Sequence, residues 1–438
     1  MLQSLQSMFR IPELKRRLLM TAFLLVVYRL GSHVPTPLID GGALASFFTA
    51  QAQGTLLGLY DLFVGGNFSR ATIFSLGIMP YISASIILQL FGAVIPYFER
   101  LQKEGEEGRK KITQYTRYGT VLLSAIQAFG IAIFLEGLNG QSEMPIVVAP
   151  GFGFRLLTML TMTTGTVFVM WLGEQMTEKG IGNGISLIIM IGIVARGPND
   201  LINTARLVVA GSMSIFTILF IAVFMVATTA FVVWMTKAQR KIPVQYAKRI
   251  VGRKMYGGQN THIPLRVNTA GVIPIIFAQS IVVFPSTLAS FFPNSDSMQV
   301  MVQLFRPGSF IYSMLYALLI IFFTYFYTAI VLNPVDLAEN MKKYGGFIPG
   351  VRPGMTTAKY IDRIMTRITL PGSLYLALIA VIPDILMGRL GIPFYFGGTS
   401  LLIIVGVSLD TLQQIESHLL IRHYDGFLKK GKLKARTR

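Results

Sequence analysis

The sequence lacks cysteine altogether and has few histidines and few charged residues. Among 438 residues there is no cysteine, and the four histidines are scattered (His33, His262, His418 and His423). These absences exclude a disulfide framework, a thiolate metal site and a cysteine nucleophile, and they argue against any metal or redox cofactor. Charged residues make up 13% of the chain, against about 25% in a soluble protein. Most of the chain is therefore predicted to lie out of water.

Long apolar runs, in contrast, are abundant. A helix needs roughly 20 apolar residues to cross the hydrocarbon core, where backbone groups can bond only within the helix. Two shorter runs can also cross, Leu18–Val34 and Leu370–Leu386, whereas Ile185–Ala195 could equally be a re-entrant segment on length alone. The runs that meet the length requirement directly are approximately 73–95, 118–136, 154–173, 213–235, 269–292, 310–332 and 398–421.

The excess of positive charge decides whether residues 185–195 cross. The chain has 39 Lys and Arg against 20 Asp and Glu, a net +19 that would suggest a nucleic-acid partner in a soluble protein. If every run crosses, 32 of the 39 basic residues fall on one side. Otherwise residues 236–267, with eight basic and no acidic residues, would lie outside, against the positive-inside rule. We therefore predict an all-α membrane protein with ten transmembrane helices and both termini cytoplasmic.

Three features interrupt this apolar pattern. Leu56–Arg70 is apolar and glycine-rich but too short to cross, so we interpret it as a half-helix folded into the bundle; an amphipathic helix on the outer surface is the alternative. Asp410 lies about halfway along the tenth span and should face water or a partner. The second and seventh spans share a Gly-x-x-Pro pattern, at Gly77–Pro80 and Gly271–Pro274, which hints at an inverted repeat with proline-weakened helices.

Two cytoplasmic stretches, 236–267 and 333–369, are too long to be simple connections, and the first alternates like a strand over Ile242–Tyr246. We expect both to fold and project. Their basic character favours docking of an acidic protein or of RNA phosphates, and contact with anionic lipid is the alternative.

Several long motifs closely resemble those of the bacterial SecY family, whose members are the central channel subunit of the Sec protein translocase. The resemblance extends from about Glu13 to the tail. The matching runs are Gly77–Leu90, Arg109–Thr120, Trp171–Ser186, Gln245–Arg249, Val267–Pro274, Asn333–Gly354, Thr357–Leu370 and Pro393–Ile404.

The resemblance implies two pseudo-symmetric five-helix halves, an inverted repeat around an hourglass pore. The corresponding division is a cytoplasmic amphipathic N-terminus (1–17), an N-terminal half (18–196, with a plug at about 56–74), an external hinge loop (197–212), a C-terminal half (213–421) and a basic cytoplasmic tail (422–438).

The resemblance also implies roles for particular residues. A ring of apolar residues would close the pore: Ile78, Ile82, Ile185, Ile189, Ile276 and Ile403. The plug would comprise Tyr60, Asp61, Leu62, Phe63, Val64, Gly65, Gly66, Asn67, Phe68, Ser69 and Arg70, with the glycine pair as a flexible joint and the two charges easing hydration on displacement. Ser83, Asn268 and Gln279 would be contacts at a lateral gate through which signal sequences reach lipid, and the sequence does not show how they pair. The docking surface would use Lys248, Arg249, Arg253, Lys254 and Arg352.

The implied function is passage of unfolded secretory chains across the bacterial inner membrane and lateral release of hydrophobic segments. The chain has no GxxxxGK[ST] phosphate loop, so energy would come from partners. The implied partners are SecE, SecG, SecA, the ribosome, signal peptides, preproteins and anionic lipid, with SecDF and YidC as further ones. A secondary transporter for a small solute is the competing hypothesis. An intramembrane hydrolase is weaker, since no histidine lies in an apolar span at helical spacing from Ser or Asp.

Overall fold

The computed structural model describes the chain except for residues 1–10, 49–55, 140–144, 212–213, 247–248, 252–253, 257–259, 291–308, 391–397 and 431–438. The contacts divide the chain into two compact units. The first contains residues 1–206, 283–306 and 403–438, and the second contains 207–282 and 307–402.

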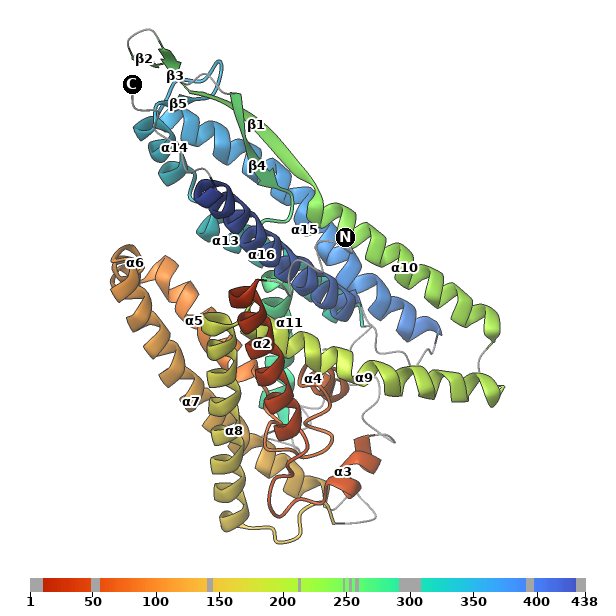
Figure 1. Ribbon diagram of the computed structural model, residues 1–438. Helices are drawn as coiled ribbons and strands as arrows, with labels where there is room; N and C mark the ends of the chain where they lie inside the picture. The colour runs from red at the N-terminus through yellow and green to blue at the C-terminus, as the bar shows by residue number, and fades with distance from the viewer. Residues whose placement is uncertain are drawn as a thin grey trace. The chain divides into compact units, whose positions relative to one another are not determined.

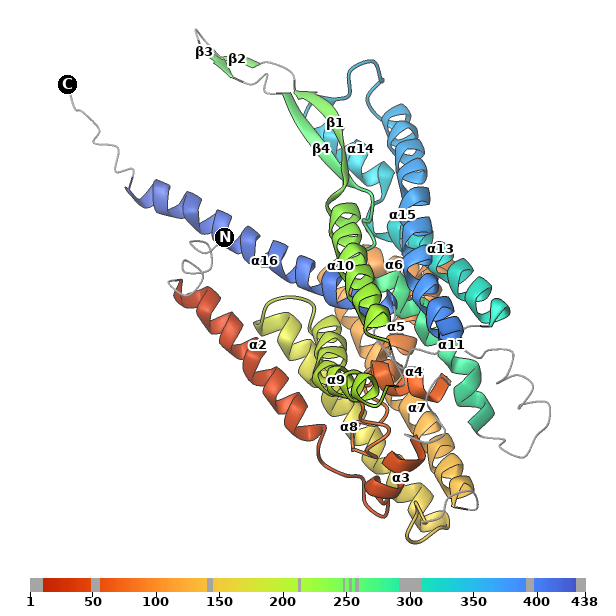
Figure 2. The same cartoon turned by 90° about the vertical axis from the view of Figure 1, so that its right-hand side faces the viewer.

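Each of the ten predicted spans coincides with a helix (Figures 1 and 2). These helices are α2 (Pro12–Gly31), α5 (Met79–Val94), α7 (Glu106–Leu138), α8 (Phe152–Lys179), α9 (Gly184–Val209), α10 (Ile215–Lys237), α11 (Ile273–Ser290), α13 (Phe310–Val331), α15 (Met355–Leu390) and α16 (Gly398–Lys430). Among the described residues, the helices long and apolar enough to cross a membrane unaided are α7, α8, α10, α13, α15 and α16. A seventh span arises if α5 is joined to α6 (Pro96–Lys103), which follows a bend of 98°. The apolar parts of α9 and α11 are shorter, and α2 carries Lys15, Arg16, Arg17 and Arg29.

Helices α7 and α8 lie side by side in the first unit (Figure 1). Small and hydroxyl side chains, Thr116, Thr120, Ser124 and Ala128, recur every four residues on a buried face of α7. The three hydroxyls donate to backbone carbonyls of the preceding turn, as from Thr120 Oγ1 to Thr116 O at 2.7 Å. Such residues allow close helix approach without leaving a polar group unsatisfied in the membrane.

The Gly-x-x-Pro motifs begin helices and do not weaken their interiors. Pro80 and Pro274 lie in the first turns of α5 and α11, where their missing N–H leaves no intrahelical hydrogen bond unmade. Gly77 (φ 56°) and Gly271 (φ 64°) supply the left-handed residue that precedes each helix. The prediction of helical structure from residue 73 and from residue 269 was therefore wrong by several residues at each start. The predicted weakening of these helices by Pro80 and Pro274 was also wrong, because both prolines lie in a first turn.

Residues 197–209, expected to form most of an external hinge loop, instead continue α9, which contains Pro198 in its interior. Apolar residues still recur seven positions apart after the proline, as at Leu201 with Val208 and Ile202 with Val209, which is a helical spacing. The last helix, α16, belongs from Ile403 onward to the first unit. There Leu14, Ile181 and Ile415 pack in one buried cluster. The five-helix halves thus differ from the compact units, and they remain a prediction.

The second unit folds its two cytoplasmic stretches together, as expected. β1 (Gln239–Tyr246) pairs antiparallel with β4 (Asn260–Arg266) and at its far end with β5 (Gly346–Phe347). A small hairpin, β2 (Arg249–Val251) with β3 (Lys254–Tyr256), extends from it, and Figure 1 shows β1 continuing directly from α10. The sheet packs on α14 (Pro334–Lys343) and α15 through a buried cluster made of Ile242, Val244, Leu265, Met341, Ile348, Ile361 and Met365.

Candidate functional site

The segment from Leu56 to Ile78, called the inner segment below, is the irregular part of the first unit. It starts with α4 (Leu56–Phe63) and continues as turns up to α5. Residues 60–68 are all buried, with Phe68 2% and Val64 2% exposed. The alternative of an amphipathic helix lying on the outer surface is therefore wrong, and the interpretation as a half-helix folded into the bundle is confirmed.

The glycine pair forms a defined helix end. Gly65 (φ 76°) and Gly66 (φ 79°) are both left-handed. The N–H of Gly66 donates to Asp61 O at 2.8 Å and that of Gly65 to Leu62 O at 3.1 Å. These two bonds are the Schellman pattern, which satisfies carbonyls at the end of α4. Both glycines are held by hydrogen bonds in this conformation, and their role as a flexible joint stays a prediction.

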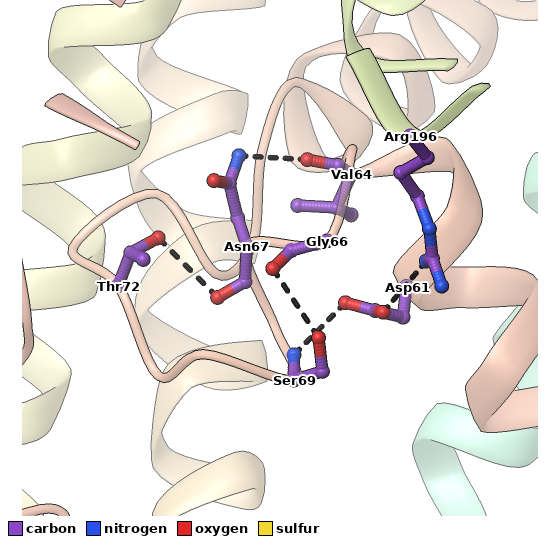
Figure 3. A network of polar contacts seen from close by, with 7 residues as sticks. All are labelled: Asp61, Val64, Gly66, Asn67, Ser69, Thr72 and Arg196. Carbon is purple, nitrogen blue, oxygen red and sulfur yellow. Dashed lines mark hydrogen bonds and ion pairs between the residues drawn. The ribbon is translucent and has the colours of Figure 1, made fainter. Parts of the chain in front are cut away.

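Asp61 is the most buried charge of the inner segment and connects three parts of the chain (Figure 3). Its side chain is 3% exposed, and Oδ2 lies 2.8 Å from Nη1 of Arg196 on α9. Oδ1 accepts the backbone N–H of Ser69 at 2.8 Å. Arg70, by contrast, is exposed. Asp61 is thus paired while the segment is in place, and the prediction that both charges ease hydration on displacement stays a prediction.

Amide and hydroxyl groups hold the returning chain (Figure 3). Asn67 Nδ2 donates to Val64 O at 2.7 Å and to the Tyr28 hydroxyl at 3.2 Å. The carbonyl of Asn67 accepts from the backbone N–H of Thr72 at 3.0 Å and from its hydroxyl at 3.3 Å. Asn67 therefore ties the inner segment to itself and to α2.

Two glycines on neighbouring helices make room for the inner segment. A Cβ on Gly65 would lie 2.7 Å from Gly192 Cα on α9. A Cβ on Gly165 of α8 would collide with the carbonyl of Ile73. Contacts this close between backbones are possible only where a residue has no side chain. The inner segment is thus seated against α8 and α9 by shape.

Aromatic rings also pack the inner segment against the surrounding helices. Phe68 packs edge-to-face on Tyr60 with ring centroids 5.4 Å apart, and Phe74 stacks on Tyr28 at 5.7 Å. The Tyr60 hydroxyl donates to Ser75 O at 3.3 Å. Burial, with a smaller contribution from the Asp61 carboxylate, raises the pKa of Tyr60 far above its ordinary value. Tyr60 is therefore a neutral hydrogen-bond donor at any physiological pH.

The six isoleucines predicted to form a pore ring lie on four helices. Ile78 caps the start of α5, and its carbonyl accepts from Ile82 N at 3.1 Å, so these two residues share one helix face. Ile185 and Ile189 are likewise one turn apart on α9. Five members belong to the first unit, whereas Ile276 on α11 belongs to the second. All are buried except Ile185, which is half-buried. Their convergence on one ring remains a prediction.

The three residues predicted at a lateral gate also belong to different units. Ser83 is half-buried on α5 in the first unit. In the second unit, the buried Asn268 donates from Nδ2 to the Tyr375 hydroxyl of α15 at 3.1 Å. Gln279 is 1% exposed, and its Nε2 has no hydrogen-bond partner among the described residues. Asn268 therefore contacts α15, and the gate role of these residues stays a prediction.

Of the five predicted docking residues, the structure describes the side chain of Arg352 only. Arg352 is exposed in the turn that follows β5. Arg249 and Lys254 lie in the β2–β3 hairpin, opposite Tyr256 and Val251. Lys248 and Arg253 lie outside the described residues.

Comparisons with known proteins agree with these observations. The SecY family model matches residues 72–412. "Protein translocase subunit SecY" of Escherichia coli (strain K12) is 49% identical over 425 residues, covering 96% of this chain and 95% of the relative. The chain belongs to the SecY family. The resemblance seen in the sequence motifs is thereby confirmed.

Solved structures give the same fold. "The structure of a protein conducting channel" matches with a TM-score of 0.67 at 18% identity, covering 96% of this chain and 95% of that one. A structure described as "The plug domain of the SecY protein stablizes the closed state of the translocation channel and maintains a membrane seal" matches with a TM-score of 0.65 at 19% identity, with the same coverage. The all-α, ten-helix fold predicted for this SecY family member is confirmed.

Arg196 and Gly192 on α9 are, with Tyr28 and Gly165, contacts of the inner segment that sequence reasoning missed. Arg196 directly follows the apolar run 185–195, and Asp61 lies in an otherwise apolar stretch. The sequence offered one clue to this pair: an acid within an apolar stretch and a base at the end of an apolar run carry opposite charges, and such charges usually pair. Their separation of 135 residues hides the pairing from any local pattern.

Proposed function

We propose that this chain is the protein-conducting channel subunit of a bacterial Sec translocase in the inner membrane. It passes unfolded secretory polypeptides outward and releases hydrophobic segments sideways into lipid. Membership in the SecY family supports this function. The observation that carries it is the inner segment: a short helix and turns, buried over residues 60–68 and held to α2 and α9 by side-chain contacts rather than by a spanning helix.

The inner segment is the plug of this channel. Irregular backbone at membrane depth is stable only when protein or a water-filled cavity surrounds it. Here protein surrounds it, on α2, α8 and α9. A plug built from turns can leave its seat without unfolding a spanning helix, so the bundle around it can remain intact when the channel opens.

The isoleucines form the constriction that closes the pore. Ile78, Ile82, Ile185, Ile189, Ile276 and Ile403 offer apolar, β-branched side chains without hydrogen-bonding groups. Such side chains fit a polypeptide of any sequence, and an apolar constriction resists ions by dewetting. Ser83, Asn268 and Gln279 act at the lateral gate.

The cytoplasmic sheet of the second unit is the docking surface for SecA or the ribosome, and SecE and SecG complete the complex. The three-stranded sheet holds Arg240, Lys241 and Arg266, and the turn beyond β5 holds Arg352. A rigid, basic surface of this kind attracts acidic proteins and RNA phosphates. The sheet is rigid because its underside is part of a buried apolar cluster.

Site-specific crosslinking tests the channel function. Because the chain has no cysteine, Ile82→Cys places a single thiol at the predicted ring. With SecE, SecG, SecA and ATP in proteoliposomes, a preprotein arrested midway should crosslink to this thiol. The matched control is Leu219→Cys on α10, whose side chain is 60% exposed on an apolar helix surface. Equal crosslinking at both positions, or transport of a small solute with no preprotein translocation, would overturn the proposal.

A further inference from the structure

The ion pair between Asp61 and Arg196 is unusual among the charge pairs of the described residues. Its two side chains are 3% and 25% exposed, whereas the other pairs keep at least one partner between 38% and 74% exposed. It also connects residues that are 135 positions apart, one on α4 and the other on α9. This ion pair therefore joins two distant parts of the chain in a partly desolvated environment.

The carboxylate of Asp61 uses both oxygens. One accepts the Ser69 N–H at 2.8 Å, which holds the returning chain of the inner segment, and the other accepts from Arg196 at 2.8 Å (Figure 3). Arg196 therefore holds both the helical part and the turn part of the inner segment through one acid. Beside it, the backbones of Gly65 and Gly192 meet.

We propose that Arg196 is a positioning residue that fastens the plug to α9 through Asp61, and that breaking this ion pair is a required step of channel opening. The inference rests on the proposed function of the inner segment. Replacing Arg196 leaves the buried Asp61 carboxylate without its ion-pair partner, which is strongly unfavourable. Moving the plug into water instead lets both charges be hydrated. A lost partner therefore favours the displaced plug.

The Asp61–Arg196 ion pair also sets a threshold for channel opening. Apolar contacts weaken gradually as surfaces separate, whereas a hydrogen-bonded ion pair has a narrow range of good geometry. The seated plug is thus held until the contact is broken as a whole. Arg196 on α9 lies seven residues after Ile189 of the predicted ring, on the same helix. A chain that pushes on α9 at the ring would act on the fastening directly.

Plug displacement can be measured independently of transport. Val64 is 2% exposed within the inner segment, so Val64→Cys is labelled by a membrane-impermeant maleimide only when the plug leaves its seat. In the purified full complex in proteoliposomes, Asp61→Asn and Arg196→Gln should each raise the labelling rate about tenfold or more. Arg196→Lys keeps the charge and should give a smaller rise.

The matched control removes a different ion pair of the same unit. Arg155 pairs with Glu136 at 2.7 Å, with side chains 38% and 11% exposed, and neither residue belongs to the inner segment. Arg155→Gln should leave the labelling rate of Val64→Cys unchanged. An equal rise in Arg155→Gln and Arg196→Gln would overturn the proposal, because it would reflect general loosening of the bundle.

A double variant tests whether the two residues act through each other. If they do, Asp61→Asn with Arg196→Gln removes both charges together, and the labelling rate should be well below the product of the two single effects. A purely multiplicative result would overturn the proposal. Preprotein translocation into the same proteoliposomes, driven by SecA and ATP, separates the fastening from the channel function. Raised labelling in a complex that translocates no preprotein supports the fastening and contradicts the channel function, whereas unchanged labelling contradicts the fastening itself.

Discussion

Two adjacent glycines of the inner segment, Gly65 and Gly66, allow the effect of one close backbone contact to be measured separately. Gly65 and Gly66 have nearly the same left-handed conformation, with φ of 76° and 79°. Their surroundings differ. A Cβ on Gly66 would have Arg196 Cδ as its nearest neighbour at 3.9 Å, an ordinary contact, whereas a Cβ on Gly65 would lie 2.7 Å from Gly192 Cα. Alanine substitutions at the two positions therefore differ mainly in how close the new Cβ comes to the backbone of α9.

The magnitudes follow from these distances. An alanine held in the left-handed region costs about 1–2 kcal/mol, a factor of about 5–30 in an equilibrium. Gly66→Ala should destabilise the seated plug by this amount, because the displaced segment can leave the left-handed conformation. Gly65→Ala adds an overpacking cost of about 1–3 kcal/mol, since the obstacle is backbone and not the flexible end of a side chain. The two variants should therefore differ by about 5- to 150-fold.

The assay is the maleimide labelling rate of Val64→Cys in the full complex, with each glycine variant added. We expect the order Gly65→Ala, then Gly66→Ala, then the unmodified segment, from fastest to slowest. Gly192→Ala provides an independent check from the other side of the contact. Its Cβ would lie 3.3 Å from Gly65 Cα, and its helical backbone carries no left-handed cost. Equal labelling rates for Gly65→Ala and Gly66→Ala would refute the argument that close backbone contact seats the plug.

Three further predictions concern the ring and the docking sheet. Arg352→Glu should lower ATP-driven preprotein export into inverted vesicles, because it reverses an exposed docking charge; export equal to that of an exposed control, Lys359→Glu, would contradict this role. Ile403→Asn and Ile276→Asn should each raise the resting conductance in planar bilayers, since a polar constriction stays wetter; currents matching the unmodified channel would count against the ring assignment. Ile242→Ala should cost about 2–5 kcal/mol in the buried cluster under the sheet and speed proteolysis of residues 239–266; an unchanged cleavage rate would show that the sheet does not depend on this packing.

Hydropathy and charge identify most of this architecture from the sequence because both are local properties. An apolar run long enough to cross must become a helix, wherever its neighbours lie, since its backbone has no other hydrogen-bond partners in lipid. For this reason all ten predicted spans coincide with helices, including the short run at 185–195 that only the charge distribution could assign. The alternation at Ile242–Tyr246 similarly predicted β1.

Local patterns are less informative where helices begin and end. Pro80 and Pro274 could either interrupt a helix or begin one, and hydropathy is the same in both cases. The left-handed glycines that precede them settle the matter, but a glycine's conformation follows from its surroundings. The extension of α9 beyond Pro198 is a similar case, because a proline in the sequence does not show whether the helix ends there or continues.

The amino-acid sequence by itself determined the spans, the topology and the SecY family. Only the tertiary structure decided how the inner segment is held. Asp61 and Arg196 each appear in the sequence as an isolated charge among apolar residues, and Gly65 and Gly192 as ordinary glycines. Ion pairing and close backbone contact depend on distances in space between residues far apart along the chain. The fold alone brings these four residues together, and it turns two unfavourable charges into a fastening.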